Sequence, residues 1–317
     1  MSRPIVFNST HVPADLIADL EKDFEVIEVP EGTTDFSSYP SPVGWIMDGA
    51  TPVDAAALAQ LPELKVVSNY GVGYDSLVAA DLKAAGVIAT NTPGVLDNAV
   101  AELTLGLIIA MGRGIVGFDA YTRDGRWIKD EGDAPLTRDV HGSTVGIVGL
   151  GRIGSRLAQL LKPLNVNVIY HNRNKRPESE TAGLAEWREW EDLLAESDFV
   201  VLQVPLTERT RGFFIAEDFA MMKDTAYLIN MARGAVVNTG DLIEAVKTKK
   251  IAGAALDVFE QEPLPLDHPL VELEGVVLLP HIGSATVETR RDMIELAVRN
   301  LRNGVLGQPV ETPIDLG

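Results

Sequence analysis

The stretch Thr144–Gly154, T-V-G-I-V-G-L-G-R-I-G, limits the possible folds of this chain more than any other. It leads from a short apolar run into Gly149-x-Gly151-x-x-Gly154 and then into Ser155–Lys162, which has helical spacing. A strand, a glycine-rich turn and a helix in that order are typical of the site that binds a dinucleotide pyrophosphate, where the helix N-terminus offers free N–H groups. We therefore expect a nucleotide-binding domain around this stretch.

In such a site, each of the three positions requires glycine for a physical reason. Gly149 permits a tight turn, Gly151 lets the backbone approach the pyrophosphate, and Gly154 lets the helix pack close to the strand. Glycine is common in this chain, at 28 of 317 residues, so the flanking strand and helix carry more weight than the spacing alone. The alternative is a glycine-rich turn in another α/β protein.

Composition excludes several classes of function. The chain has 27 Lys and Arg against 46 Asp and Glu, a net charge of −19, which argues against a nucleic-acid partner because such binding needs a basic patch. Cysteine is absent, so disulfides and thiol chemistry are excluded. The N-terminus has no signal-peptide pattern and no apolar run spans a bilayer, so we expect a cytoplasmic protein without a membrane partner. We predict no metal site.

Apolar runs alternate with helical segments along the chain, and this alternation predicts parallel sheets covered by helices on both faces. In the first part we expect strands at 4–8, 24–29, 43–47, 65–68 and 87–90, and helices at 13–21, 52–60 and 76–85. In the second part we expect strands at 144–149, 166–171, 198–204, 225–230, 252–257 and 276–280, and helices near 152–163, 189–196, 217–222 and 239–248.

Three further segments complete the expected organisation. Residues 98–117 form one long apolar helix, residues 123–142 form an extended polar arm, and the helix at 285–303 returns to the first domain. The predicted fold class is α/β with two domains, a doubly wound Rossmann nucleotide-binding domain and a smaller flavodoxin-like substrate domain. The expected boundaries are 1–97 with 285–317 for the discontinuous substrate domain, and 98–284 for the dinucleotide-binding domain.

The residues at the end of the second nucleotide-domain strand predict which dinucleotide binds. An NAD site has an Asp or Glu there for the ribose 2′-OH, but this chain has Asn172, followed by three cationic side chains in four positions. Such a loop suits an adenosine 2′-phosphate, since no carboxylate repels it and guanidinium groups pair with it. We predict NADPH (NADP) over NADH, with Arg173 as the main contact and Arg176 or Lys175 assisting. The alternative is a solvated basic loop.

Three polar residues follow predicted strands on the nucleotide side: Arg233, Glu262 and His281. Ligands of open α/β sheets bind outside the carboxyl ends of strands, so all three can converge on the nicotinamide. In ketone reduction a histidine delivers the proton, a carboxylate orients the imidazole and favours its protonated form, and an arginine grips a substrate carboxylate. Taken singly, each residue is more often structural or a surface charge.

Together with further motifs, these residues make the chain similar to the D-isomer-specific 2-hydroxyacid dehydrogenases over nearly its whole length. The matching pieces are Asn69–Asp75, Asn91–Glu102, Val145–Gly154, Val204–Thr207, Ile229–Asn238, Gly253–Pro263 and Leu279–Thr286.

The resemblance implies roles for individual residues. Arg233, Glu262 and His281 match the family's catalytic set, with histidine as the acid/base and glutamate as its partner. The backbone N–H groups of Val72 and Gly73, with Arg233, match its substrate site. The implied cofactor contacts are Gly149, Gly151, Arg152, Ile153, Gly154, Asn172, Arg173, Arg176, Pro205 and Asp257, the last holding the nicotinamide amide.

Within the family, the resemblance is to NADPH-dependent glyoxylate/hydroxypyruvate reductases and hydroxyphenylpyruvate reductases. A small 2-oxo acid is therefore the first expected substrate, ahead of an aromatic 2-oxo acid and then 2-ketogluconate. A nucleotide-sensing corepressor is the alternative of another class. The resemblance also implies a homodimer. A separate hypothesis, based on the position of Trp127 in the expected arm, is that a partner subunit caps the pocket with this side chain. Candidates for the pocket wall, each with core packing as the alternative, are Trp45, Met47, Tyr70, Leu96 and Trp127.

Overall fold

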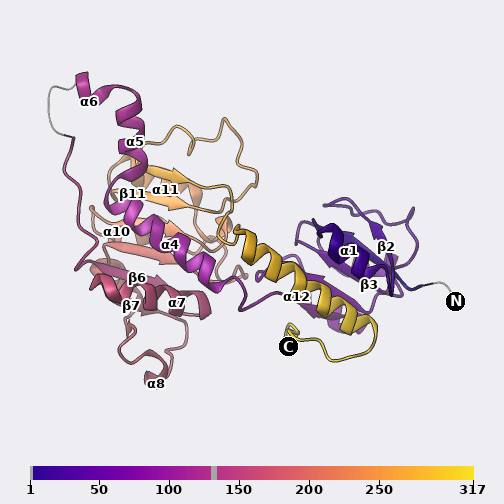
Figure 1. The fold of residues 1–317 in the computed structure, drawn as a ribbon. Coiled ribbons are helices and arrows are strands. Elements are labelled where there is room, and N and C mark those ends of the chain that lie inside the picture. The colour runs from indigo at the N-terminus through magenta and orange to yellow at the C-terminus, as the bar shows by residue number, and fades with distance from the viewer. Residues whose placement is uncertain (1–2, 130–133) are drawn as a thin grey trace. The chain divides into compact units, whose positions relative to one another are not determined.

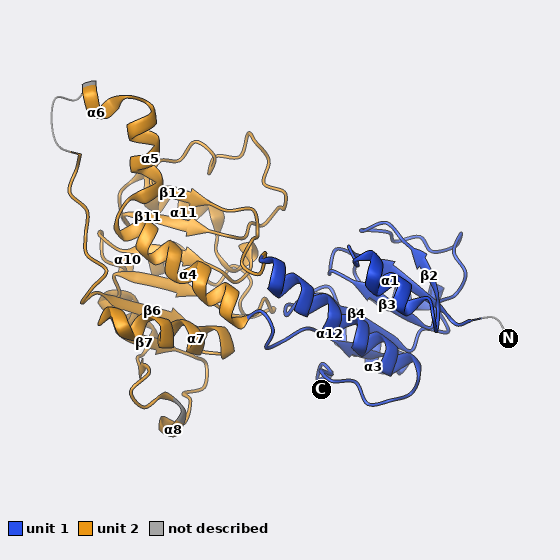
Figure 2. Ribbon diagram, viewed as in Figure 1, with its two compact units in different colours: residues 1–96, 286–317 blue, residues 97–285 orange. Residues whose placement is uncertain are grey.

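The computed structural model describes residues 3–129 and 134–317, and the chain divides into two compact units (Figure 2). Unit 1 comprises Met1–Leu96 and Thr286–Gly317, and unit 2 comprises Asp97–Ala285. Each unit is built on a parallel sheet, so the predicted α/β class is confirmed. The sequence was expected to divide after residues 97 and 284, whereas these units divide after residues 96 and 285.

Unit 1 is a five-stranded sheet in the order β2-β1-β3-β4-β5, which is the flavodoxin-like order. Its elements are β1 (Ile5–Ser9), α1 (Ala14–Leu20), β2 (Glu25–Glu28), β3 (Gly44–Met47), α2 (Ala55–Gln60), β4 (Val66–Asn69), α3 (Ala79–Ala85), β5 (Ile88–Thr90) and α12 (Val287–Val305). Helices α1 and α12 cover one face (Figure 1), where Val6, Ile46 and Val66 are buried against Ala297 and Leu301. Helices α2 and α3 cover the other face.

Unit 2 is a seven-stranded sheet in the order β12-β11-β10-β9-β6-β7-β8, a doubly wound sheet with one added edge strand. Its strands are β6 (Thr144–Val148), β7 (Asn167–His171), β8 (Glu186–Trp187), β9 (Phe199–Leu202), β10 (Tyr227–Asn230), β11 (Gly253–Leu256) and β12 (Val276–Leu278). Its helices are α4 (Asp97–Gly112), α5 (Ile115–Arg123), α6 (Arg126–Lys129), α7 (Arg152–Leu161), η1 (Lys162–Leu164), α8 (Glu178–Thr181), α9 (Trp190–Glu196), α10 (Ala216–Met221), η2 (Gly234–Val236) and α11 (Thr239–Lys247).

Alternate residues of the central strands point to opposite faces of this sheet, as the period of two requires. In β9, Phe199 and Val201 pack with α4 and α7, whereas Val200 and Leu202 pack with α9, α10 and α11. Since both faces are covered, the strands read as continuous apolar runs. This is why their positions are predictable from the sequence.

The structure corrects the prediction of one helix over residues 98–117. Helix α4 ends at Gly112, and α5 begins at Ile115 after a bend of 58°. Gly114 between them has φ of 60°, a left-handed conformation that interrupts a right-handed helix. Among the described residues, no single helix is long and apolar enough to cross a membrane, and this pair reaches that length only across the bend.

The expected extended arm at residues 123–142 is also partly wrong. Its first part is helical, because α5 continues to Arg123 and α6 follows at Arg126–Lys129. Residues 130–133 of the predicted arm lie outside the described residues, and residues 134–139 form no helix or strand. The short elements β8 and α8 were not predicted, since two and four residues are too few to show a period.

Candidate active site

The turn after β6 has the geometry that a bound pyrophosphate needs. Gly149 has φ of 101°, and a Cβ there would lie 2.6 Å from the Gln203 carbonyl oxygen. A Cβ on Gly154 would lie 2.7 Å from the Gly149 carbonyl oxygen, so only glycine lets α7 approach the turn this closely. Gly151 is exposed, and a Cβ there would meet no atom within 4 Å. The turn is therefore closely packed against the protein at Gly149 and Gly154, and it has free space for a ligand at Gly151.

The loop after β7 is bound to the same turn through side chains. Asn172 Oδ1 accepts a hydrogen bond of 2.7 Å from the Leu150 N–H. Arg176 Nη1 donates to the Leu150 carbonyl at 3.0 Å and to Ser155 Oγ at 2.8 Å, whereas Arg173 is exposed. The guanidinium group of Arg176 is thus held beside the glycine-rich turn. Ser155 was not among the predicted contacts.

Among the residues that the structure describes, the other predicted nucleotide contacts form no side-chain hydrogen bond to this turn. Arg152 Nε lies 3.7 Å from Asp97 Oδ2, and Ile153 is half-buried in the first turn of α7. Pro205 is exposed after β9, and the ammonium group of Lys175 lies 5.5 Å from the centre of a tryptophan ring. The residues present therefore fit a dinucleotide with the pyrophosphate at Gly149–Gly154 and the adenosine ribose beside Asn172.

The three polar residues predicted to be catalytic follow three adjacent strands. Arg233 follows β10, Glu262 follows β11 and His281 follows β12, and these strands are neighbours in the sheet. Gly234 brings the first two loops into contact, because a Cβ at that position would lie 1.8 Å from the Phe259 carbonyl carbon. Only glycine allows the backbone that carries Arg233 to lie directly against the loop that carries Glu262.

The structure joins Glu262 and His281 by a hydrogen bond of 2.7 Å between Oε2 and Nδ1. The other carboxylate oxygen, Oε1, accepts from the Phe259 N–H at 2.8 Å, so the carboxylate is held from two sides. Burial raises the pKa of Glu262, but the hydrogen bonds from His281 and Phe259 and the charges of His281 and Arg233 outweigh it and lower the pKa overall. Because Nδ1 is engaged, Nε2 is the nitrogen that can exchange a proton with a substrate.

Arg233 is half-buried next to this pair. Its Nη1 donates to the Ala232 carbonyl at 2.9 Å, and its charge contributes to the lowered pKa of Glu262. A guanidinium group has five N–H donors in a planar arrangement that matches a carboxylate. The structure therefore brings together the charges of all three predicted catalytic residues.

Asp257, at the end of β11, holds the backbone next to His281. It is 2% exposed, and its two carboxylate oxygens accept from the Ile282 N–H at 2.7 Å and the Gly283 N–H at 2.8 Å. Burial raises the pKa of Asp257 despite these two bonds, which act in the opposite direction. His281 itself has φ of 52°, so the two bonds stabilise a turn that a β-carbon disfavours.

The predicted substrate residues of unit 1 lie in the loop after β4. Val72 and Gly73 are half-buried there. Of the candidate wall residues, Trp45 and Met47 lie in the core at 0% and 1% exposure, so the core-packing alternative holds for them. Trp127 on α6 is 61% exposed.

Comparison with known proteins shows which family has a sequence of this kind. The model of one protein family, described as "D-isomer specific 2-hydroxyacid dehydrogenase, NAD binding domain", matches residues 105–283. The glyoxylate reductase of Thermococcus litoralis is 41% identical over 314 residues, which cover 94% of this chain and 93% of the relative. The chain belongs to the D-isomer-specific 2-hydroxyacid dehydrogenase family. The predicted family resemblance is thereby confirmed.

Two further relatives extend over the full length of this 2-hydroxyacid dehydrogenase. The glyoxylate/hydroxypyruvate reductase B of Citrobacter koseri is 39% identical and covers 96% of both chains. The crystal structure of the NADPH-dependent glyoxylate/hydroxypyruvate reductase of Sinorhizobium meliloti, in complex with NADP and malonate, has a TM-score of 0.89 at 31% identity. That match covers 99% of this chain and 98% of the other.

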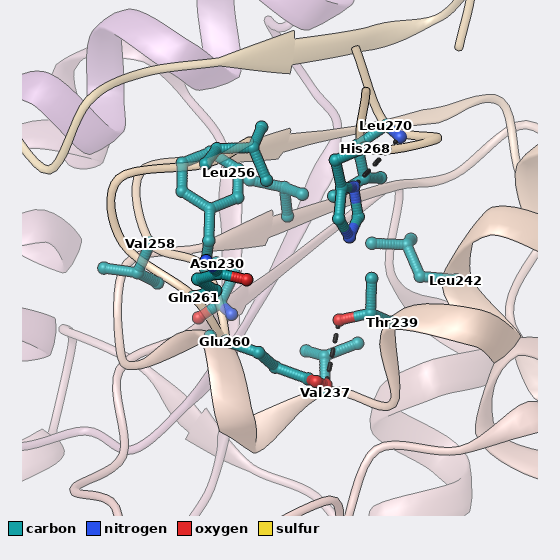
Figure 3. Close-up of a pocket in the computed structure, with 13 residues that line it drawn as sticks. Asn230, Val237, Thr239, Leu242, Leu256, Val258, Glu260, Gln261, His268 and Leu270 are labelled. Carbon is teal, nitrogen blue, oxygen red and sulfur yellow. Dashed lines mark hydrogen bonds between the residues drawn. The ribbon is translucent and has the colours of Figure 1, made fainter. Parts of the chain in front are cut away.

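The dehydrogenase also has a cavity of about 140 Å³ beside α11, shown in Figure 3. His268 and Thr239 face it, with Thr239 Oγ1 donating to Glu260 Oε1 at 2.9 Å and the Leu270 N–H donating to His268 Nδ1 at 3.2 Å. Among the described residues that line this cavity, none is Arg233, Glu262 or His281. The cavity is therefore lined by residues 259–261 of the loop that carries Glu262, but not by the acid/base pair itself.

Proposed function

We propose that this dehydrogenase reduces a small 2-oxo acid with NADPH, either glyoxylate to the achiral glycolate or hydroxypyruvate to its D-2-hydroxy acid. The observation that carries the proposal is the hydrogen bond between His281 Nδ1 and Glu262 Oε2, formed beside Arg233 at the carboxyl ends of adjacent strands. Relatives named glyoxylate reductase and glyoxylate/hydroxypyruvate reductase support the choice of substrate.

Each residue of the site then has a task in ketone reduction. When bound, the nicotinamide supplies a hydride to the carbonyl carbon of the substrate. His281 gives the carbonyl oxygen a proton from Nε2, while Glu262 keeps the imidazole oriented through its bond to Nδ1. Arg233 grips the carboxylate and polarises the carbonyl, and the N–H groups of Val72 and Gly73 bind carboxylate oxygens.

The preference for NADPH is part of the same proposal. Asn172 contributes no negative charge at the ribose site, and Arg176 is already held beside the glycine-rich turn by Ser155. Arg173 lies in the same loop and is exposed, so its guanidinium group is accessible to a 2′-phosphate. An NADP complex of a relative supports this choice.

The nucleotide preference is tested by kcat/KM with NADPH and with NADH. We expect a ratio well above one for the wild type, and we expect Arg173→Ala to lower kcat/KM with NADPH while leaving NADH unaffected. The exposed Arg211 offers a control outside this loop, since Arg211→Ala should leave the ratio unchanged. A ratio near one or below in the wild type contradicts the proposal.

The enzymatic proposal is tested with a panel of 2-oxo acids assayed with both nucleotides. Rapid NADPH oxidation with glyoxylate or hydroxypyruvate supports it. If phenylpyruvate or 2-ketogluconate is turned over faster, that compound is the substrate and the choice of glyoxylate or hydroxypyruvate is wrong. Tight NADPH binding without turnover of any 2-oxo acid refutes the enzymatic reading and favours a nucleotide sensor.

We also propose that the enzyme acts as a homodimer in the cytoplasm. Apolar side chains are exposed along α5 and α6, with Ile115 and Val116 at about half exposure and Trp127 and Ile128 at 61% and 85%. Burial of such side chains in a second copy stabilises a dimer. Analytical ultracentrifugation of the wild type and of Ile128→Glu tests this, and a monomeric wild type contradicts it.

A further inference from the structure

The loop after β4, residues 69–73 (hereafter the carboxylate loop), has its carbonyl groups bound by two asparagine side chains. Asn69 Nδ2 donates to the Gly71 carbonyl at 3.2 Å and to the Gly73 carbonyl at 2.9 Å. Asn91, which follows β5, donates from Nδ2 to the Val72 carbonyl at 2.9 Å. Three successive carbonyls are thus held on the inner side of the loop.

These bonds determine where the N–H groups of the loop point. In a trans peptide the C=O of one residue and the N–H of the next lie in one plane and point in opposite directions. The bond from Asn91 to the Val72 carbonyl therefore directs the Gly73 N–H outward, and the bond from Asn69 to the Gly71 carbonyl does the same for the Val72 N–H. In the described part of the chain, neither N–H donates to a protein acceptor. Successive outward N–H groups form an anion-binding nest.

Asn91 is in turn held by a segment more than 200 positions later in the sequence. Thr312 Oγ1 donates to the Asn91 carbonyl at 2.6 Å and accepts from Asn300 Nδ2 at 2.7 Å. Asn300 lies on α12 and is 0% exposed, and its Oδ1 accepts from the Glu311 N–H at 2.8 Å. A continuous series of hydrogen bonds therefore runs from α12 through Thr312 and Asn91 to the carboxylate loop.

We propose that Asn91 is a positioning residue for the substrate carboxylate, and that the segment around Thr312 acts on the carboxylate loop through Asn91. This inference rests on the proposed function, because it assumes that Val72 and Gly73 receive a carboxylate. It adds that their N–H groups are kept in place by residues that do not touch the substrate. The network selects for a carboxylate and leaves nucleotide binding unaffected.

Steady-state kinetics of Asn91→Ala test the proposal. We expect the KM for glyoxylate and the inhibition constant of oxalate to rise by up to about tenfold, the upper range for the loss of one hydrogen bond. The carboxylate is held equally in the ground and transition states, so kcat should change little. The KM for NADPH should stay at the wild-type value. Thr312→Val should produce a smaller change of the same kind, and Thr312→Ser should restore wild-type values.

Asn303→Ala is the matched control. Asn303 also lies on α12 and donates from Nδ2 to the Pro309 carbonyl at 3.2 Å, in the segment that leads to Thr312 but without a bond to Asn91. We expect this variant to have wild-type KM values. If Asn91→Ala lowers the melting temperature and leaves the glyoxylate KM and the oxalate inhibition constant unchanged, Asn91 is merely structural and the proposal is overturned.

Calorimetric titration of oxalate into the NADPH-loaded enzyme separates this inference from the proposed function. A wild type that binds oxalate but reduces no 2-oxo acid refutes the proposed function, and weaker oxalate binding by Asn91→Ala still supports the positioning role. A wild type that does not bind oxalate overturns the positioning role.

Discussion

Replacing Glu262 with Gln removes the negative charge beside His281 and keeps the shape of the side chain. The wild-type bond from Nδ1 to Oε2 measures 2.7 Å, a length typical of a charge-assisted hydrogen bond. Such a bond contributes about 1.5–3 kcal/mol when it is shielded from water. The side chains of His281 and Glu262 are 48% and 35% exposed, so solvent screening places this bond at about 1 kcal/mol or less.

This magnitude predicts a loss of rate in 2-oxo acid reduction. The carboxylate accepts from Nδ1 and so holds the imidazole with Nε2 available for proton transfer. A loss of about 1 kcal/mol corresponds to a factor of about five, so Glu262→Gln should lower kcat/KM for glyoxylate by up to about fivefold.

The assay is kcat/KM for glyoxylate with NADPH at one fixed pH. Glu260→Gln is the control, because Glu260 lies in the same loop but accepts from Thr239 Oγ1 and not from His281. We expect Glu260→Gln to have the wild-type kcat/KM. An unchanged kcat/KM in Glu262→Gln would show that the carboxylate does not assist the imidazole, and the reasoning would be refuted.

Further predictions concern the residues around this pair. His281→Ala should lower kcat about 10²–10⁴-fold, and near-wild-type turnover would contradict its acid/base role. Asp257→Asn should lower kcat about tenfold, because an amide cannot accept from both N–H groups that Asp257 holds next to His281; unchanged kinetics would show that the turn holds without them. Because the pKa of Glu262 is lowered in the folded protein, its ionised carboxylate contributes to stability. This contribution is complete above the ordinary pKa of Glu and is lost as the pH falls through the lowered value. Melting temperatures from pH 7 to 3 should show this loss in the wild type and not in Glu262→Gln. Gly154→Ala should destabilise the protein by about 1–3 kcal/mol and weaken NADPH binding, because its Cβ would lie 2.7 Å from the Gly149 carbonyl oxygen; an unchanged urea midpoint would contradict this.

The sequence predicts the strands of both sheets closely because these strands are buried on both faces. In β6, for example, four of the five residues are buried, and the run stands out from its polar surroundings. Helix ends are less predictable. Helix α2 was expected to begin near residue 52 but begins at Ala55, because the Asp54 side chain accepts from the N–H groups of Ala56 and Ala57 and caps the helix.

The candidate site shows where sequence reasoning ends. The positions of Arg233, Glu262 and His281 after strands were predictable, since parallel strands end at one edge of a sheet. The pairing of Glu262 with His281 was expected from the chemistry and from the family resemblance. The second bond of this carboxylate, from the Phe259 N–H to Oε1, was not predicted, because it depends on how the loop folds. Asn91 begins a segment that resembles the family, but nothing in the sequence indicated its partners, since Thr312, which holds it, is 221 positions away. No periodicity or spacing connects residues at such a separation.

The discontinuity of unit 1 affects the order in which the protein can fold during synthesis. Unit 2 leaves the ribosome complete before Thr286, whereas the sheet of residues 1–96 must wait for α12. Until then Ile46 and Val66 lack the helix that buries them, and Ser68 lacks its bond to the Ala297 carbonyl, 229 positions away. The earliest part of the polypeptide is therefore the last to reach its native state, and its apolar face stays exposed to aggregation until α12 has been synthesised.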